Sequence, residues 1–600
     1  MADNTITNKT SDMPFKKVIS TFTKSLGTYK KTFILALIFL AGEVAAENVL
    51  PYYTAILIDK IKAGSALDQI MHLGLVLIIF SLISLVSGSI AAMFAADTST
   101  GLAKNLRRDM FYNVQTFSHA NIDKFSAPSL VTRLTTDVDN IQRSFLMSII
   151  YAIRGPFMLI FALIMAYKMA GQIALIFLAI IPLLTIALAI IIKNAVPYFT
   201  RVFRRYDKLN LTINENIHAI REVKSYVRED YEQSKFEKAT FALFKDFEKA
   251  EKIVALVGPT MRVCMGILFT YVIYQGSWAI ISSKATLLDV GQFSALITYG
   301  VMVMFSLINI TFVFAMITMA EESAKRIAEV LVEKTTITNP QNAITTINSG
   351  SIEFDNVSFK YSPDAEEYVL KDINLTIPSG TTVGIIGATG SAKTSLAQLI
   401  CRLYDTTLGS VLVNGTDTRK YDLDTLRGAV AIVEQKNMLF SGTIADNLRW
   451  GNKDATDEEI KEVCKIASAD EFISGFEKGY DTEISQGGSN VSGGQKQRLC
   501  IARALLKHPK VLIFDDSTSA VDTKTDANIR ASLKKYAPDT TKLIIAQRIS
   551  SVSDADMIVV MNKGRIESVG THDELLTSSD IYSETFKSQT RKSVEEGGLE

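Results

Sequence analysis

Six long apolar stretches constrain what this chain can fold into more than any other feature of its 600 residues. A helix of about 20 apolar residues crosses the hydrocarbon core of a bilayer. The stretches are found at 32–57, 70–96, 144–167, 172–196, 253–282 and 291–318. They predict an all-α transmembrane domain with six spans over residues 32–330. The remainder of the chain reads as a soluble domain.

The charged residues between these stretches predict the orientation of the chain. Short polar connections follow the first, third and fifth stretches, whereas the segments after the second and fourth are long and rich in Lys and Arg. Lys residues also precede the first stretch, in a polar N-terminus that lacks the apolar core of a signal peptide. Because positively charged segments stay in the cytoplasm, we expect a multi-pass protein of the cell membrane with both termini cytoplasmic.

Charge and cysteine content exclude several classes of protein. Lys plus Arg and Asp plus Glu both number 63, so no net positive field favours nucleic acid as a partner. The four cysteines are scattered without pairing or metal-ligand spacing, so neither a disulfide framework nor a zinc site is indicated.

Several ionisable side chains fall within the predicted spans, among them Glu43 and Glu47 in the first, Arg154 in the third and Arg262 in the fifth. Charge inside a bilayer is costly, so such residues normally face a cavity or a partner. One interpretation is a wet substrate pathway that attracts cations. The alternative, which we favour, is an internal ion pair with one of the arginines, or a position near the interface.

A glycine-rich loop follows a predicted strand in the soluble part. Residues 387–394 fit the phosphate-binding pattern G-x-x-x-x-G-K-[ST], with Ala392 in place of the second glycine. Backbone N–H groups of such a loop cradle phosphate oxygens, Lys393 can neutralise the β and γ phosphates, and the Thr394 hydroxyl can bind Mg²⁺. The apolar strand 511–515 ends in Asp515, which we expect to be a second Mg²⁺ partner.

Residues 490–522, NVSGGQKQRLCIARALLKHPKVLIFDDSTSAVD, resemble the signature motif, Walker B strand and D-loop of an ATP-binding cassette (ABC) transporter. Six spans followed by one cassette resemble an ABC exporter half-transporter of the type IV fold, from about Phe15 to Lys587. The expected domains are an N-terminal cytoplasmic tail with an elbow helix (1–31), the transmembrane domain (32–330), a linker (331–350), an α/β P-loop nucleotide-binding domain (351–587) and a C-terminal tail (588–600).

The resemblance implies MgATP as the ligand and assigns roles residue by residue. Tyr361 corresponds to the aromatic that stacks on adenine, Gln435 to the Q-loop glutamine that contacts Mg²⁺, and Asp522 to the D-loop acid. The expected ATP-binding loop comprises Gly387, Ala388, Thr389, Gly390, Ser391, Ala392, Lys393, Thr394 and Ser395. The signature motif lent to a partner comprises Ser492, Gly493, Gly494 and Gln495. Coupling helices are expected near 121–125 and 214–220.

Two positions depart from the family pattern. Asp516 stands where Glu usually polarises the attacking water, and Gln547 stands where a switch histidine is usual. Asp is shorter by about 1.5 Å, and general-base catalysis depends on hydrogen-bond reach. Glutamine cannot carry a proton as histidine does. Because both changes weaken one step while Lys393 and Asp515 are retained, we expect ATP to bind and to be hydrolysed weakly at this chain's own site.

These departures resemble the degenerate-site subunit of a bacterial heterodimeric multidrug exporter. The resemblance implies a non-identical half-transporter as partner, which would supply the catalytic Glu and the switch His to a site completed by this chain's signature. Small amphipathic compounds are the expected substrates, with membrane lipids around the spans. A lipid or peptide exporter, and an ATP-gated channel or regulatory subunit, remain as alternatives.

Overall fold

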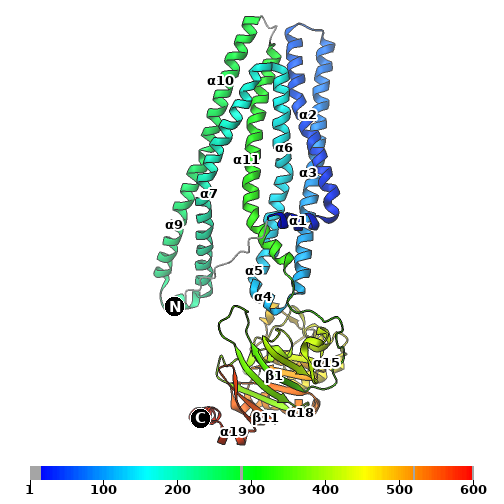
Figure 1. The fold of residues 1–600 in the computed structure, drawn as a ribbon, viewed down its shortest axis with the longest axis vertical. Helices are drawn as coiled ribbons and strands as arrows, with labels where there is room; N and C mark the ends of the chain where they lie inside the picture. Colours follow the sequence, from blue (N-terminus) through cyan, green and yellow to red (C-terminus); the bar gives the residue numbers. More distant parts are fainter. Residues whose placement is uncertain (1–14, 284–287, 518–520, 598–600) are drawn as a thin grey trace. The chain divides into compact units, whose positions relative to one another are not determined.

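The computed structural model describes residues 15–283, 288–517 and 521–597, which form two compact units (Figure 1). Unit 1 comprises Met1–Gln115 and Pro128–Glu333, and unit 2 comprises Thr116–Ala127 and Lys334–Glu600. Parts of the two predicted tails, of the connection after the fifth apolar stretch and of the D-loop lie outside the described residues, at 1–14, 598–600, 284–287 and 518–520.

Unit 1 is built from long helices that run side by side (Figure 1). They are α1 (Phe15–Ser25), α2 (Lys30–Lys62), α3 (Leu67–Gln115), α6 (Val138–Ala170), α7 (Leu175–His218), α9 (Glu229–Ala255), α10 (Val257–Ser283) and α11 (Val290–Val332). Short helical segments connect them: η1 (Gly27–Tyr29), α5 (Ala127–Thr132), η2 (Arg133–Asp137), η3 (Gly171–Ala174) and α8 (Ile220–Ser225). The prediction of a helical transmembrane domain is confirmed.

Five helical stretches in the described residues are long and apolar enough to cross a membrane. They are Gly27–Lys62, Leu67–Gln115, Ala127–Phe199, Glu229–Ser283 and Val290–Phe314. The third takes in both the third and fourth predicted spans, because α6 runs through η3 into α7 without a non-helical linker. At this junction Gly171 adopts φ 52°, a left-handed conformation that suits glycine. The count of six spans therefore stays a prediction.

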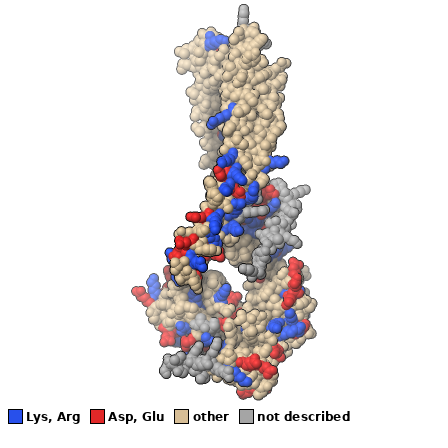
Figure 2. All heavy atoms as spheres, turned by 90° about the vertical axis from the view of Figure 1, so that its left-hand side faces the viewer, with Lys and Arg blue, Asp and Glu red and all other residues tan. Residues whose placement is uncertain are grey.

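Apolar side chains point outward from the membrane part of unit 1. Along α3, Met71, Leu75, Ile78, Leu82 and Leu85 recur at helical spacing and are all more than half exposed. Such a stripe suits a lipid-facing surface, because contiguous exposed apolar patches are rare on soluble monomers. On the face drawn in Figure 2, the upper part of unit 1 is mostly uncharged, and charged residues gather towards the end of the α7–α9 hairpin.

Unit 2 is an α/β fold with three sheets. The central six-stranded sheet has the order β12-β11-β3-β10-β9-β6, and a four-stranded antiparallel sheet has the order β2-β1-β4-β5. The strands are β1 (Ile352–Phe359), β2 (Leu370–Ile377), β3 (Thr382–Gly387), β4 (Leu408–Val413), β5 (Thr416–Asp417), β6 (Val430–Val433), β7 (Gly442–Thr443), β8 (Glu483–Ile484), β9 (Val511–Asp515), β10 (Thr541–Ile545), β11 (Met557–Asn562) and β12 (Arg565–Gly570). Strands β7 and β8 form the third, two-stranded sheet.

Helices surround these sheets. They are α4 (His119–Phe125), α12 (Lys393–Ile400), α13 (Leu423–Ala429), α14 (Ile444–Arg449), α15 (Asp457–Ile466), α16 (Asp470–Ser474), α17 (Gly493–Leu505), α18 (Thr523–Tyr536), α19 (His572–Ser578) and α20 (Asp580–Gly597), with 3₁₀ turns η4 (Thr418–Lys420), η5 (Gly479–Asp481), η6 (Gln486–Gly488) and η7 (Ile549–Ser551). Membership of α4 in unit 2 differs from the predicted domain division, which kept residues 32–330 together.

The parallel strands of the central sheet bring the predicted site residues to one edge. Strand β10 pairs in parallel with both β3 and β9, with Ile545 opposite Ile385 and Asp515. The carboxyl ends of parallel strands meet at the same edge of a sheet, where ligands bind in open α/β folds. The loops after Gly387, Asp515 and Ile545 therefore begin next to one another.

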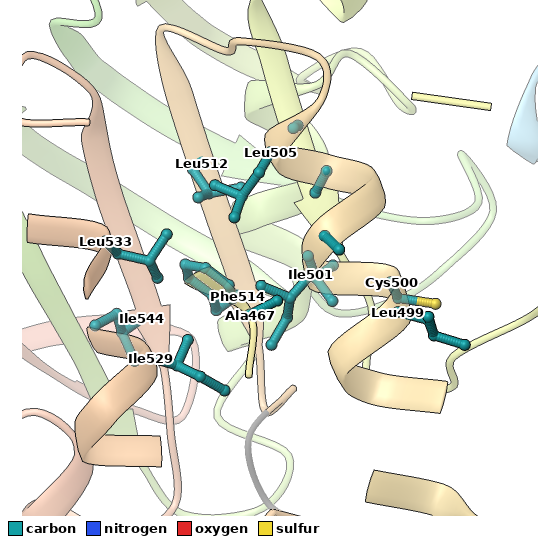
Figure 3. Close-up of a cluster of buried hydrophobic side chains, with 14 of the residues drawn as sticks. Ala467, Leu499, Cys500, Ile501, Leu505, Leu512, Phe514, Ile529, Leu533 and Ile544 are labelled. Carbon is teal, nitrogen blue, oxygen red and sulfur yellow. The ribbon is translucent and has the colours of Figure 1, made fainter. Parts of the chain in front are cut away.

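Strand β9 is buried on both faces, as expected for a central parallel strand. Leu512 and Phe514 lie in one cluster with Ile501 of α17 and Ile529 of α18 (Figure 3). Ile513 belongs to the cluster on the other face, which includes Leu396 and Ala397 of α12. Because side chains alternate along a strand, Asp515 shares the face of Ile513 and projects towards α12.

Candidate functional site

The loop between β3 and α12 has the shape expected of a phosphate-binding loop. A Cβ atom on Gly387 would lie 2.3 Å from the carbonyl oxygen of Met561 on β11, so only glycine fits there. Gly390 adopts φ +84° and has open space around it. The N–H of Ser391 donates to the carbonyl oxygen of Ala388 at 3.1 Å, which closes the turn ahead of the helix.

Lys393 folds back over this loop. Its ammonium donates to the carbonyl oxygens of Gly387, at 2.7 Å, and Ala388, at 3.0 Å. Burial lowers the pKa of Lys393, although the carboxylates of Asp516 and Asp515 act in the opposite direction. A compact cation held against the loop carbonyls is well placed to exchange these contacts for phosphate oxygens.

Ala392 adopts φ 72° and ψ 25°, the left-handed conformation, as the residue before α12. A residue with a Cβ adopts this conformation at a cost of roughly 1–2 kcal/mol. The glycine expected here by the loop pattern would carry no such cost. The replacement is therefore accompanied by backbone strain, which the sequence analysis did not anticipate.

Thr394 and Asp515 form the predicted Mg²⁺ pair. The Thr394 hydroxyl donates to Oδ1 of Asp515 at 3.0 Å, and Asp515 is only 4% exposed. Burial raises the pKa of Asp515, while the bond from Thr394 lowers it. A hydroxyl and a carboxylate side by side are hard oxygen donors of the kind that Mg²⁺ prefers alongside phosphates. The two residues fit the metal that the sequence predicts.

Asp516 receives two amide groups on one oxygen. Gln435 Nε2 donates to Asp516 Oδ2 at 3.1 Å, and Gln547 Nε2 donates to the same atom at 2.8 Å. Asp516 itself has φ 48°, a left-handed conformation that Asp tolerates better than most residues. The structure thus brings together the Q-loop residue and both positions at which the sequence departs from the family pattern.

Tyr361 lies among aromatic side chains. Its ring meets the edges of Phe359 at 4.8 Å and Tyr404 at 5.1 Å between centroids. Its hydroxyl is 2.7 Å from Oγ of Ser395 on α12. The ring is 43% exposed, which leaves surface for stacking with a base. Its role towards adenine stays a prediction.

The signature residues begin helix α17. Ser492 is its N-cap: the N–H of Gln495 donates to the Ser492 hydroxyl at 3.2 Å, and the N–H of Ser492 donates to Oε1 of Gln495 at 2.9 Å. This reciprocal pair is a capping box. Ser492 and Gly493 are exposed, so the positive end of a 13-residue helix faces outward.

Comparisons with known proteins identify the family. The family model for the ABC transporter transmembrane region matches residues 33–307, and the ABC transporter model matches residues 370–519. An uncharacterized ABC transporter ATP-binding protein of Mycobacterium tuberculosis is 34% identical over 94% of this chain and 96% of the relative. The chain belongs to the ABC transporter family.

Two further comparisons place the chain within ABC transporters. An ATP-dependent lipid A-core flippase of Desulfotalea psychrophila is 30% identical over 96% of this chain and 100% of its own length. The structure of a bacterial Atm1-family ABC exporter with ATP bound superposes with a TM-score of 0.80 at 22% identity, covering 93% of this chain and 99% of that chain. The fold is therefore that of an ABC exporter, and family membership implies ATP-driven transport by a membrane-embedded protein.

Asp522 has a local role that the ABC resemblance did not suggest. It caps helix α18, where the N–H of Thr525 donates to its carboxylate at 2.9 Å. This bond holds the pKa of Asp522 below its ordinary value. A signal was present in the sequence, because Asp immediately before a helical pattern is a common N-cap. Its predicted part in communication across an ABC dimer is not tested by this geometry.

Helix α4 packs on the nucleotide-binding fold of unit 2. The hydroxyl of Tyr404 donates to Asp123 at 2.5 Å, and the ring of His119 lies 5.9 Å from that of Tyr404. Because Tyr404 also contacts Tyr361, the predicted coupling segment is two side chains away from the expected adenine position. Asp123 lies in the predicted coupling segment, but sequence reasoning missed Tyr404 as its partner, since 281 residues separate the two and Tyr404 belongs to no motif.

Three of the charged residues singled out in the predicted spans pair with one another. Arg154 donates to Glu43 at 2.9 Å and to Glu47 at 2.7 Å. Gly88 permits this arrangement, because a Cβ there would lie 2.9 Å from the Glu43 carboxyl carbon. The favoured interpretation, an ion pair, is confirmed for these three residues. Arg262 is exposed and has no ion pair with any described residue.

Proposed function

We propose that this chain is one subunit of an ATP-driven heterodimeric exporter, with six spans and with both termini and the cassette in the cytoplasm. It moves amphipathic drugs or lipid-like compounds out of the cell. Its own Walker site binds MgATP and hydrolyses it slowly, while its signature completes a competent site on a non-identical half-transporter. The exposed, capped signature helix supports this assignment.

The observation that carries the proposal is the amide pair on Asp516. A catalytic carboxylate must reach the attacking water and accept its proton. The Asp516 side chain is one methylene shorter than Glu, and Oδ2 already accepts hydrogen bonds from Gln435 and Gln547. Neither amide can take up a proton at neutral pH. This part of the site can hold a triphosphate by hydrogen bonds and lacks an efficient base.

The binding step needs only residues that keep the family chemistry. Lys393 can donate to phosphate oxygens, and the N–H groups between Gly387 and Lys393 can cradle them. Thr394 and Asp515 would hold Mg²⁺, which neutralises phosphate charge when bound. ATP held in this way would favour the closed pair of cassettes, and hydrolysis at the other site would reset them.

The test compares two carboxylates in the purified heterodimer reconstituted in lipid. Replacing the partner's catalytic Glu with Gln should reduce ATP turnover by about 100-fold or more, within the range expected for loss of a general base. Asp516→Asn should reduce it by less than about threefold, because Asp516 contributes little proton transfer. Equal losses would contradict the asymmetry. The proposal would also fail if this chain alone hydrolysed ATP as fast as the heterodimer.

A lipid substrate is favoured by one comparison. The relative named as a lipid A-core flippase is 30% identical over 96% of this chain. Proteoliposomes carrying a fluorescent phospholipid or an amphipathic cationic dye distinguish the two substrate classes by ATP-dependent translocation. ATP-dependent passive ion conductance without translocation of either compound would instead identify a channel.

A further inference from the structure

Helix α20 holds the loop that carries Gln547. The Gln589 amide uses both of its polar ends on that loop: Oε1 accepts from the N–H of Ile549 at 2.9 Å, and Nε2 donates to the carbonyl oxygen of Gln547 at 2.9 Å. One side chain thereby fixes two backbone groups that lie two residues apart. A glutamine amide, with one acceptor and two donors, suits this pattern as few other side chains do.

The loop that carries Gln547 is hydrogen-bonded to strand β3 at its start and to helix α20 further on. The N–H of Ala546 donates to the carbonyl oxygen of Ile385 on β3 at 3.1 Å, which continues the sheet for one residue beyond β10. Past that point the Gln589 amide bonds to the N–H of Ile549 and to the carbonyl oxygen of Gln547. The Gln547 side chain leaves this fixed backbone towards Asp516. The direction of the Gln547 amide therefore depends on the two hydrogen bonds that Gln589 of α20 makes to this backbone.

Helix α20 also forms a wall beside the phosphate-binding loop. A cavity of about 230 Å³ separates them. It is lined by Ile386, Gly387, Ala388, Thr389, Gln547, Val560, Ile581, Tyr582 and Thr585. Tyr582 is only 1% exposed and its hydroxyl lies 2.7 Å from Nδ1 of His572 on α19. The helix that bears Gln589 is thus anchored in the core one to two turns away.

We propose that Gln589 is a positioning residue that sets the preference of this site for nucleoside triphosphate over diphosphate. It keeps the Gln547 amide aimed at the edge of the sheet where Asp516 lies and where the terminal phosphate of a bound triphosphate would be. A diphosphate lacks the group that this amide would contact, so its binding does not depend on Gln589. The inference rests on the proposed ATP-holding role of the site.

The experiment measures displacement of a fluorescent ADP analogue from the full-length chain in lipid nanodiscs by AMP-PNP or ADP, each with Mg²⁺. Gln589→Ala should weaken AMP-PNP about 3- to 10-fold, the effect of roughly one ordinary hydrogen bond, and ADP by less than about twofold. Ser588→Ala, at an exposed neighbour on the same helix, should change neither. Gln589→Glu should match Gln589→Ala, because a carboxylate cannot donate to the Gln547 carbonyl.

A double variant separates positioning from a general structural role. Gln547→Ala removes the amide itself and should weaken AMP-PNP by a similar factor. Gln547→Ala combined with Gln589→Ala should be no weaker than Gln547→Ala alone, because the two residues act in series. Additive losses, equal losses for AMP-PNP and ADP, or no effect of either single variant would overturn the inference.

These readouts are independent of the proposed slow hydrolysis, since AMP-PNP is not hydrolysed. Rapid ATP turnover by this chain alone would refute the proposed function and leave the affinity ratio intact. Conversely, an unchanged ratio in Gln589→Ala would refute the positioning role while hydrolysis stayed slow.

Discussion

The phosphate-binding loop and the signature helix, both in unit 2, differ in how they depart from ideal local chemistry. At the signature, Ser492 and Gln495 form a complete capping box, and α17 packs on β9 through its apolar face. At the loop Ala392 has a left-handed backbone, as does Asp516 after the nearby strand β9, and the Asp516 carboxylate is shorter than the usual Glu.

This difference argues against general loss of function in the nucleotide-binding domain. Relaxed selection would affect both regions, whereas here two of the changes, Asp516 and Gln547, are in direct contact and the signature is intact. The residues proposed to bind phosphate and metal are all retained: Lys393 lies against the carbonyl oxygen of Gly387, and Thr394 donates to Asp515. The comparison supports the proposal that this chain binds ATP at a site where hydrolysis is weak, and that it offers an intact signature to a partner.

The largest expected effect on ATP turnover comes from a substitution in the signature motif. Gly494→Asp would place a carboxylate in the first turn of α17, where it repels the phosphates that a helix N-terminus otherwise attracts. Turnover of the heterodimer should fall by about 100-fold or more, as for loss of a preorganised anion-stabilising group. The measurement is steady-state ATP hydrolysis at saturating MgATP.

A matched control places the same charge elsewhere in unit 2. Gly479 has φ +52° and open space around it, and Asp tolerates this conformation better than most residues. Gly479→Asp should therefore keep most of the activity. Retention of more than half of the turnover by Gly494→Asp would mean that the intact signature does not serve the competent site.

A smaller effect on ATP turnover is expected from a substitution in the phosphate-binding loop. Lys393→Met keeps the aliphatic stem and removes the ammonium, so ATP affinity at this chain's own site should fall about 10- to 100-fold. Photolabelling of this chain with an azido-ATP measures that loss. Heterodimer turnover should fall less than in Gly494→Asp, since the competent site uses the partner's loop.

The control for this change is Lys461→Met on α15, an exposed lysine whose side chain forms no ion pair or hydrogen bond with any described residue. It should leave labelling and turnover unaltered. If Lys393→Met abolished turnover as completely as Gly494→Asp, the two regions would contribute equally and the proposed asymmetry would be wrong.

Much of the fold could be predicted because its signals are local. Apolar stretches indicated the helices of unit 1, and the strand, loop and helix order around Gly387 indicated the α/β fold of unit 2. Strands β3, β9 and β10 run in parallel, so the residues that follow them lie at one edge of the sheet. This explains why Asp515 and Gln547 lie near the phosphate-binding loop. Helix α4 could not be assigned in this way, since it joins unit 2 through Tyr404, far away in the sequence.

The sequence predicted which residues form the site better than it predicted the contacts among them. Asp516 was expected to be short of its target, but its two amide partners lie 81 and 31 residues away. Gln589 carries no motif, and only the packing of α20 brings it to the loop of Gln547. For Ala392 the sequence does carry a signal, because a glycine in a loop pattern often marks a left-handed backbone.

The smallest expected effect concerns that strained position. Ala392→Gly relieves a left-handed alanine, worth roughly 1–2 kcal/mol, and raises the entropy of the unfolded chain, which offsets about 0.4–1 kcal/mol. The apparent melting temperature of the full chain, at a fixed scan rate, should therefore rise slightly or stay level.

Ala388→Gly is the matched control, because Ala388 is not among the residues with positive φ. It should lower stability by about 0.5–1 kcal/mol, since it adds entropy without relieving strain. Equal destabilisation by both variants would show that the loop is not strained at Ala392. The difference between the phosphate-binding site and the signature helix would then rest on Asp516 and Gln547 alone.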